Sequence, residues 1–184
     1  MSTWETKTQV LIVCGRGIGV FEDRSEAGLL LGQELVKSSI PIDLIIGLAR
    51  GGVMVAAGVA KVLQKPFDVL VVKKIGSPGN PELAIGAVVP EGQLLDIRDK
   101  TVILTDDGAA TGATMYAAIR WAQKHKAKKI IVALPVAPPD VVAKLRMLAD
   151  DVIVLEVPLD FGAVGQFYRH FPQLTDEEVV QLLS

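Results

Sequence analysis

Short, mostly apolar runs recur along this chain and alternate with longer segments that have helical spacing. Several runs are apolar at every position instead of every second one, which is typical of strands covered on both faces in a parallel sheet. Strands that alternate with helices favour right-handed βαβ units, so the predicted fold is α/β, a doubly wound parallel sheet flanked by helices. The strands are expected at residues 9–14, 43–47, 67–72, 85–89, 101–105, 129–133 and 152–155, and the helices at residues 25–37, 53–64, 111–124, 139–148 and 176–183.

Length and composition restrict the class of protein. The 184 residues suit a single domain, 1–184, and with 50% hydrophobic and 22% charged residues the chain can bury a sizeable core. A net charge of −2 gives no reason to expect nucleic-acid binding, and the longest apolar stretch, 53–60, is far too short to cross a bilayer. Cys14 is the single cysteine, which excludes an internal disulfide, and two histidines are too few for a histidine-based zinc site. Because the first residues do not resemble a secretory signal, we expect a cytoplasmic protein without nucleic-acid or membrane partners.

The segment 102–114, VILTDDGAATGAT, carries the strongest functional pattern. Ligands of doubly wound sheets bind beyond the carboxyl ends of the strands. In this segment an apolar strand is followed first by two acids and then by a helix expected to begin near Thr111. Unpaired N–H groups at a helix N-terminus suit a phosphate, Gly112 allows close approach, and Thr111 and Thr114 offer hydroxyls. Asp106 and Asp107 would repel a bare polyphosphate but can accept hydrogen bonds from ribose hydroxyls. A divalent cation shared with a diphosphate would further compensate the negative charge. The plainer alternative is a helix cap beside two surface acids.

This segment resembles the signature of type I phosphoribosyltransferases, an apolar strand followed by two acids and a phosphate loop that contains Thr-Gly. The resemblance implies that Asp106 and Asp107 bind the 2′- and 3′-hydroxyls of phosphoribosyl pyrophosphate and help to hold Mg²⁺. The loop that would bind the donor and its 5′-phosphate consists of Gly108, Ala109, Ala110, Thr111, Gly112, Ala113 and Thr114.

One position departs from the family pattern. Members that act on 6-oxopurines usually carry an acidic residue just before the Thr-Gly of the loop, where it assists proton transfer at the base. This chain has Ala110 there. The resemblance therefore does not extend to salvage of hypoxanthine or guanine.

A second loop, Leu-Ala-Arg-Gly-Gly at residues 48–52, joins an apolar strand to a helix. Gly51 and Gly52 permit unusual backbone angles, and Arg50 can make forked contacts with phosphate oxygens. The resemblance makes this the diphosphate loop and makes the Ala49–Arg50 bond the candidate for a non-proline cis peptide. The alternative is a tight turn with one exposed arginine.

Two further segments are weaker candidates. Lys73 and Lys74 open the Gly/Pro-rich stretch 73–80, which is expected to be a mobile loop whose lysines could meet the departing diphosphate; ordinary surface lysines explain it nearly as well. Residues 155–184 would form a small hood, with Phe161 stacking on the base, although an aromatic core patch explains its aromatic residues equally well. The segment 15–19 lacks the full dinucleotide-binding spacing.

The expected activity is Mg²⁺-dependent transfer of ribose 5-phosphate from phosphoribosyl pyrophosphate to a small nitrogenous base, with Asp106, Asp107, Arg50 and Lys73 in the leading roles. The expected partners are these two substrates, and a homodimer is left open. One alternative is a regulatory protein that binds the donor without turnover. The other, a phosphatase or oxidoreductase acting on a different phosphosugar, fits the spacing of the acids and the Thr-Gly pair less well.

Overall fold

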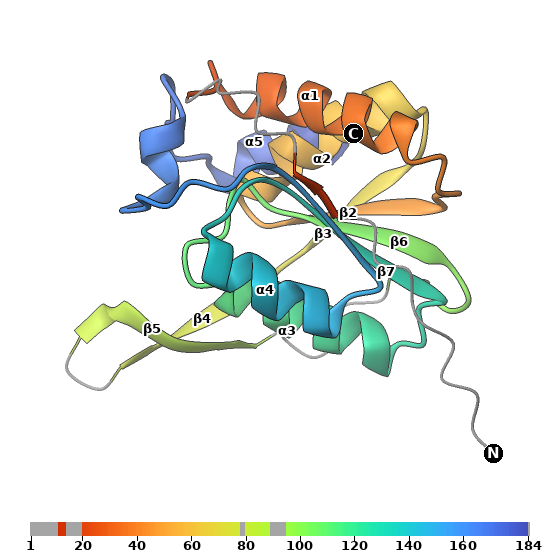
Figure 1. Ribbon diagram of the computed structural model, residues 1–184. Helices are drawn as coiled ribbons and strands as arrows, with labels where there is room; N and C mark the ends of the chain where they lie inside the picture. The colour runs from red at the N-terminus through yellow and green to blue at the C-terminus, as the bar shows by residue number, and fades with distance from the viewer. Residues whose placement is uncertain (1–10, 14–19, 78–79, 89–94, 184) are drawn as a thin grey trace.

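The computed structural model describes residues 11–13, 20–77, 80–88 and 95–183. Its main feature is a six-stranded parallel sheet with the strand order β1-β8-β7-β6-β2-β3 (Figure 1). Helices α1 and α2 cover one face of the sheet, and α3 and α4 cover the other. The strands are β1 Leu11–Val13, β2 Leu44–Leu48, β3 Phe67–Leu70, β6 Thr101–Thr105, β7 Lys129–Val136 and β8 Asp151–Glu156, and the helices are α1 Arg24–Lys37, α2 Gly51–Leu63, α3 Ala113–Lys124, α4 Pro139–Leu148 and α5 Asp176–Leu183.

Each central strand contributes to two cores because successive side chains point to opposite faces of the sheet. Ile45 and Ile103 pack with α1 and α2, whereas Ile46, Val102 and Leu104 pack with α3 and α4. All five side chains are fully buried. This explains why the runs are apolar throughout, and it confirms the predicted doubly wound α/β fold.

The stretch predicted as a mobile loop has a different structure. Residues Lys73–Ser77 form β4, which pairs antiparallel with β5, Asn80–Val88, in a separate two-stranded sheet. The described part of the strand predicted at 85–89, residues 85–88, is therefore the end of a hairpin and lies outside the main sheet. Pro78, Gly79 and Val89 lie outside the described residues. The prediction of a loop was wrong because it rested on glycine and proline, which disfavour strands. Residues Lys73–Ser77 form a strand nevertheless, because the next strand in the chain pairs with them.

The chain after β8 crosses the carboxyl ends of the strands. It contains a 3₁₀ helix, η1, at Val164–Phe167, and its next residues run beside the segment that leads into α1. Three backbone hydrogen bonds join them: Phe21 N–H to Phe167 O at 2.7 Å, Arg169 N–H to Phe21 O at 2.8 Å, and His170 N–H to Glu22 O at 2.9 Å. The segment predicted as a hood, 155–184, thus begins with the last residues of β8 and continues over the end of the sheet.

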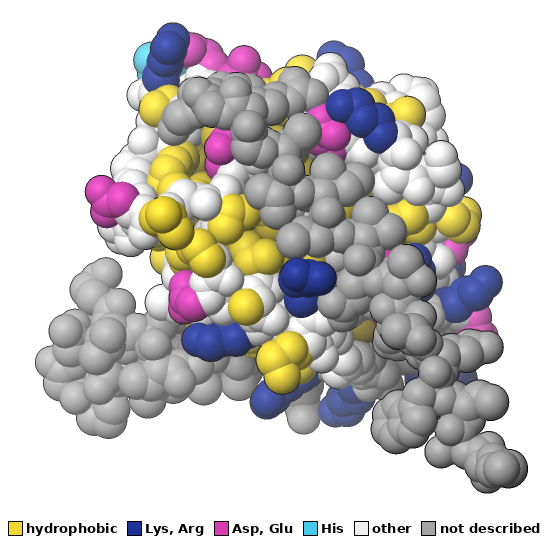
Figure 2. Space-filling view, in the orientation of Figure 1, with side chains coloured by type: hydrophobic (Ala, Val, Ile, Leu, Met, Phe, Trp, Pro, Cys, Tyr) yellow, Lys and Arg dark blue, Asp and Glu magenta, His cyan; other side chains and the backbone are white. Residues whose placement is uncertain are grey.

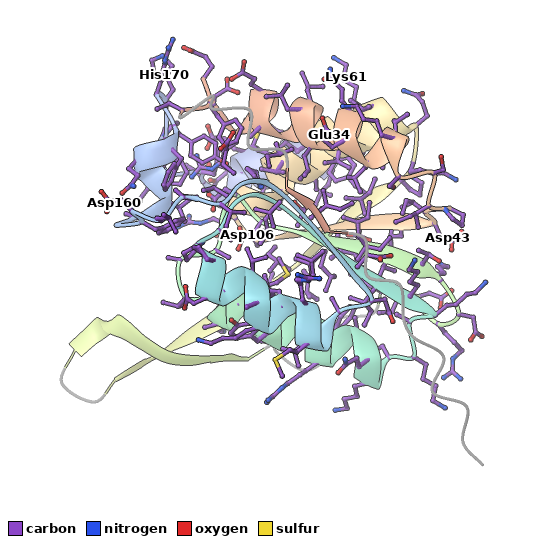
Figure 3. All side chains as sticks on the ribbon, viewed as in Figure 1. Glu34, Asp43, Lys61, Asp106, Asp160 and His170 are labelled. Carbon is purple, nitrogen blue, oxygen red and sulfur yellow. The ribbon has the colours of Figure 1, made fainter. Side chains whose placement is uncertain are left out.

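The surface shows mixed charge. Figure 2 shows lysine, arginine, aspartate and glutamate side chains interspersed on the face it draws, with hydrophobic side chains gathered left of centre. Among the described residues, no helix is both long and apolar enough to cross a membrane. Figure 3 shows Asp43 and Asp106 at opposite ends of the sheet, because one lies just before β2 and the other just after β6.

Candidate functional site

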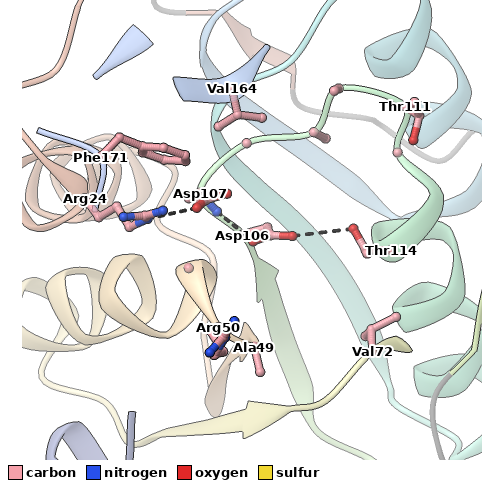
Figure 4. A pocket seen from close by; sticks show the side chains of 15 residues that line it. Arg24, Ala49, Arg50, Val72, Asp106, Asp107, Thr111, Thr114, Val164 and Phe171 are labelled. Atoms are coloured by element: carbon pink, nitrogen blue, oxygen red, sulfur yellow. Dashed lines mark hydrogen bonds and ion pairs between the residues drawn. The ribbon is translucent and has the colours of Figure 1, made fainter. Parts of the chain in front are cut away.

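A pocket of about 550 Å³ opens at the carboxyl ends of β2 and β6 (Figure 4). It lies where the sheet, the start of α1, the start of α3 and the C-terminal segment meet, as expected for a ligand site in a doubly wound sheet. The residues that line it are Arg24, Ala49, Arg50, Gly51, Val72, Asp106, Asp107, Gly108, Ala109, Ala110, Thr111, Gly112, Thr114, Val164 and Phe171.

The loop between β6 and α3 forms one wall. It is tied to the sheet by the Ala109 N–H, which donates to Val136 O at 3.0 Å, and it ends at Gly112, the N-cap of α3. Gly112 has φ +76°, a left-handed conformation that glycine adopts without steric cost. A Cβ there would lie 2.6 Å from Cζ of Tyr116, so the ring packs directly against the loop. Helix α3 thus begins two residues later than predicted and directs its first N–H groups toward the pocket.

The two aspartates at the end of β6 have different neighbours. Asp106 Oδ1 accepts a hydrogen bond from the Asp107 N–H at 2.9 Å, and its Oδ2 lies 3.5 Å from the hydroxyl of Thr114, the donor. Asp107 Oδ2 accepts from Nε of Arg24 at 2.8 Å, and its carbonyl oxygen accepts from the Tyr168 hydroxyl at 2.5 Å. The Asp106 carboxylate therefore contacts the loop between β6 and α3, the Asp107 carboxylate contacts Arg24, and Tyr168 holds the Asp107 backbone carbonyl.

The loop between β2 and α2 forms the opposite wall. The Ala49–Arg50 peptide is cis, as predicted. Gly51 lies against the carboxylate of Asp107, where a Cβ would be 2.0 Å from Oδ2, so this position has no room for a side chain. The Arg50 side chain is about half exposed, and its Nη1 is 3.7 Å from Oδ1 of Asp176 at the start of α5.

The C-terminal segment supplies an aromatic wall. Tyr168 is buried between the rings of Phe21 and Phe171, with centroid distances of 5.4 and 5.0 Å. Burial, and then the nearby charge of Asp107, raise the pKa of the Tyr168 hydroxyl, which is therefore the neutral donor to the Asp107 carbonyl. Phe171 faces the pocket, and the guanidinium carbon of Arg24 lies 3.7 Å from its ring centroid.

The structure brings most of the predicted site residues together at this pocket, and of the described side chains four are not part of its lining. Gly52 and Ala113 sit directly behind the lining, with Gly52 pressed against the backbone of Thr105 and Asp106. Lys73 is exposed at the start of β4, next to the lining residue Val72, and the side chain of Lys74 lies outside the described residues. Phe161 packs against Phe167 at a centroid distance of 5.0 Å and does not reach the pocket.

The sequence patterns missed Arg24, Val72, Val164 and Phe171 as pocket residues. Arg24 directly precedes the helix expected at 25–37 and is its first residue in the structure. One signal could have identified it: a cation in the first turn of a helix is disfavoured by the helix dipole, so such a residue needs a specific partner. No comparable signal marks Val164 or Phe171. Among the described residues, no group of three or more His, Cys, Asp or Glu side chains could hold a metal ion.

Comparison with known proteins places this geometry in a family. The family model of the phosphoribosyl transferase domain matches residues 30–171, well over half of the chain. The chain belongs to the phosphoribosyltransferase family. A provisionally named phosphoribosyl transferase of Mycobacterium tuberculosis is 40% identical over 206 residues, which cover 90% of this chain and 46% of the relative. This phosphoribosyltransferase chain thus spans about half the length of its curated relative.

Solved structures agree with the assignment. A protein from Thermus thermophilus is 34% identical, with a TM-score of 0.77 over 89% of this chain and 97% of the other. A purine phosphoribosyltransferase from Pyrococcus horikoshii, 23% identical with a TM-score of 0.56, covers 91% of this chain and 98% of its own and supports the fold alone. The phosphoribosyltransferase fold is therefore common to this chain and to both structures.

Proposed function

We propose that this protein transfers ribose 5-phosphate from phosphoribosyl pyrophosphate to a nitrogenous base and releases diphosphate. The observation that carries the proposal is the convergence of three groups on one pocket: the phosphate loop, the acid pair and the Arg50–Gly51 turn. Each suits a different part of one donor molecule, since the loop can hold a 5′-phosphate, the acids ribose hydroxyls, and the turn a diphosphate.

In the proposed reaction, the bond from C1 of the ribose to the diphosphate oxygen breaks, and a bond from C1 to a nitrogen of the base forms. Positive charge develops on the ribose, and the two neighbouring carboxylates stabilise it. The backbone of residues 109–112 and the Thr111 and Thr114 hydroxyls hold the 5′-phosphate, while Arg50 receives the diphosphate. Holding the donor at both ends fixes C1 relative to the base, which is a major source of rate enhancement. Lys73 is exposed and follows the lining residue Val72 in the chain, which supports assigning it to the departing diphosphate.

The donor set also fits Mg²⁺. This ion prefers oxygen ligands and is usually held by one or two carboxylates together with phosphate oxygens of the substrate. Asp106, whose carboxylate faces Thr114 at the mouth of the phosphate loop, provides such oxygens. When bound, the ion would neutralise charge on the diphosphate.

We therefore expect phosphoribosyl pyrophosphate to bind weakly without Mg²⁺, because the diphosphate and the two aspartates repel each other. Calorimetric titration with Mg²⁺ and with EDTA measures this difference. Ribose 5-phosphate, which lacks the diphosphate, is the control and should be nearly indifferent to the metal. Equal donor affinity in EDTA would contradict the proposed role of the metal.

Ala110 bears on the choice of base. It is exposed at the pocket, where an acidic residue would be a proton partner for a 6-oxopurine. Because general acid–base assistance contributes roughly 10²–10⁴-fold in rate, its loss at this position should make hypoxanthine and guanine poor substrates in terms of kcat/KM.

Steady-state assays with hypoxanthine, guanine, xanthine, adenine, uracil and orotate test both the activity and this preference. Turnover of any base confirms the proposed function, and binding of the donor without turnover of any base points to the regulatory alternative. An archaeal orotate phosphoribosyltransferase from Saccharolobus solfataricus is 33% identical over 87 residues, which makes orotate a useful member of the panel. Efficient use of hypoxanthine would show that Ala110 does not govern base choice.

A further inference from the structure

One side of the pocket carries none of the groups assigned to the donor. Figure 4 shows Val164 and Phe171 on one side of the acid pair and Ala49 and Arg50 on the other. In a direct displacement, the incoming nitrogen approaches C1 from the side opposite to the departing diphosphate oxygen. Because Arg50 would receive the diphosphate, the acceptor base is expected on the side of Val164 and Phe171.

This apolar side of the pocket is in close contact with the rest of the site. Val164 packs on the loop after β6, where a Cβ on Gly108 would lie 2.7 Å from its Cγ1. The next residue of η1 packs on the aromatic wall, because a Cβ on Gly165 would lie 3.0 Å from Cδ1 of Phe171. A small shift of η1 would therefore change the width of the pocket on this side.

A single exposed side chain, that of Gln166, holds the loop that leads into η1. Its Oε1 accepts hydrogen bonds from the N–H groups of Gly162 and Ala163, both at 3.0 Å. Its Nε2 donates to the carbonyl oxygen of Asp160 at 3.3 Å. Gln166 does not line the pocket, so these bonds act on the backbone of residues 160–163 and not on a ligand.

The same loop has a second, apolar anchor. Phe161 packs against Phe167 at a centroid distance of 5.0 Å. An exposed hydrogen bond changes an equilibrium by only about fivefold, so the loss of the Gln166 bonds should not unfold this segment while the ring contact remains. It should instead release the direction of the backbone, which two N–H groups converging on one oxygen now fix.

We propose that Gln166 is a positioning residue for the acceptor base. By holding residues 160–163, it sets Val164 at the distance from the acid pair at which a base fits beside C1. Groups that line a binding site must be held within about 0.5 Å of their working position, and they depend on such supporting contacts. The inference rests on the proposed function and adds a residue outside the pocket that determines how well the base is held.

Calorimetric titration with ribose 5-phosphate and with the 5′-monophosphates of adenosine, guanosine, inosine, uridine and orotidine tests the proposal. These ligands share the phosphate and the ribose, so the difference in affinity isolates the contacts of the base. At least one nucleotide should bind the wild type more tightly than ribose 5-phosphate, because its base buries apolar surface against Val164 and Phe171. Gln166→Met keeps the length of the side chain but makes no such hydrogen bonds. It should bind that nucleotide about tenfold more weakly and ribose 5-phosphate equally well.

Three further variants sharpen the test. Gln166→Glu keeps an oxygen for both N–H groups and should retain most of the nucleotide affinity. Val164→Ala should weaken nucleotide binding, and in combination with Gln166→Met the loss should be smaller than the sum of the two, because one residue acts through the other. Gln123→Met is the matched control: it makes the same exchange at an exposed glutamine in the last turn of α3, bonded to Leu148 O at 3.1 Å, and should change no affinity.

Unchanged nucleotide affinity in Gln166→Met, or an equal loss for ribose 5-phosphate, would overturn the proposal. If circular dichroism shows that this variant is unfolded, Val164→Ala decides, and unchanged nucleotide affinity there has the same consequence. A wild type that binds ribose 5-phosphate but no nucleotide more tightly would overturn the inference and leave the donor site intact. A wild type that binds neither kind of ligand would contradict the proposed function itself, and the inference with it.

Discussion

Two arginines in the pocket differ in how firmly they are held. Arg24 is buried and has three partners on the Asp107 and C-terminal side. Arg50 is about half exposed, and its ion pair with the exposed Asp176 spans 3.7 Å. Exposed pairs of this kind contribute little to stability, so Arg50 can exchange Asp176 for another anion at small cost. A movable arginine beside a rigid one suits the proposed release of a diphosphate.

Replacing Arg50 with alanine should weaken diphosphate binding by roughly ten- to a hundredfold, the effect of losing a charge-assisted contact. Binding of ribose 5-phosphate should stay nearly intact, because that ligand ends at C1. Calorimetric titration of both ligands measures the difference. The control is Asp176→Asn, which removes the partner without touching the arginine and should not weaken diphosphate binding. Equal losses of both ligands would mean that Arg50 supports the fold instead of the ligand.

The loop between β6 and α3 depends on one backbone conformation. Gly112 ends the loop with φ +76°, and the Tyr116 ring, one turn into α3, occupies the space that a side chain would need. The Tyr116 N–H donates to Gly112 O at 2.9 Å, so the loop and the first turn of the helix are one unit. The direction of the first N–H groups of α3 is therefore set by Gly112.

Gly112→Ala should lower both stability and phosphate affinity. The left-handed conformation costs a non-glycine residue about 1–2 kcal/mol, and the contact with Tyr116 adds to this. Chemical denaturation and titration with ribose 5-phosphate measure the two effects. Gly162→Ala is the matched control, because a Cβ there would meet only the flexible end of Gln166. If Gly112→Ala bound ribose 5-phosphate as well as the wild type, the loop would not be the phosphate site.

The molecule as a whole closes its site with segments from near both ends of the described chain. The residues before α1 pair with those after η1, and the joined segments reach the acid pair through Arg24 and Tyr168. The Tyr168 hydroxyl donates to the carbonyl oxygen of Asp107, and Phe21 packs against its ring. Loss of this anchor should therefore affect global stability and the position of the acid together.

Stability should fall above pH 10 through Tyr168. Burial raises its pKa above the 10.0 of an unfolded tyrosine, so the unfolded chain releases its proton first and the folded state is penalised as the pH rises. One such group contributes a slope of up to about 1.4 kcal/mol per pH unit. Between pH 8 and 11, the denaturation midpoint should fall less steeply with pH for Tyr168→Phe than for the wild type. At neutral pH this variant should lose about 1 kcal/mol of unfolding free energy, because the hydrogen bond to Asp107 is gone. Equal alkaline slopes would contradict this.

Patterns among neighbouring residues were enough to predict the doubly wound sheet, the strand at 101–105, the helices at 139–148 and 176–183, and most of the pocket lining. Apolar periodicity and the chemistry of a helix start are local properties, and so they can be read along the chain. The roles of Arg24 and Phe171 depended on tertiary contacts instead. Arg24 meets Asp107, 83 residues away, because α1 packs on the sheet with its first turn above the end of β6. No local pattern records which distant carboxylate a buried guanidinium will reach, since burial and pairing arise only when the chain is folded.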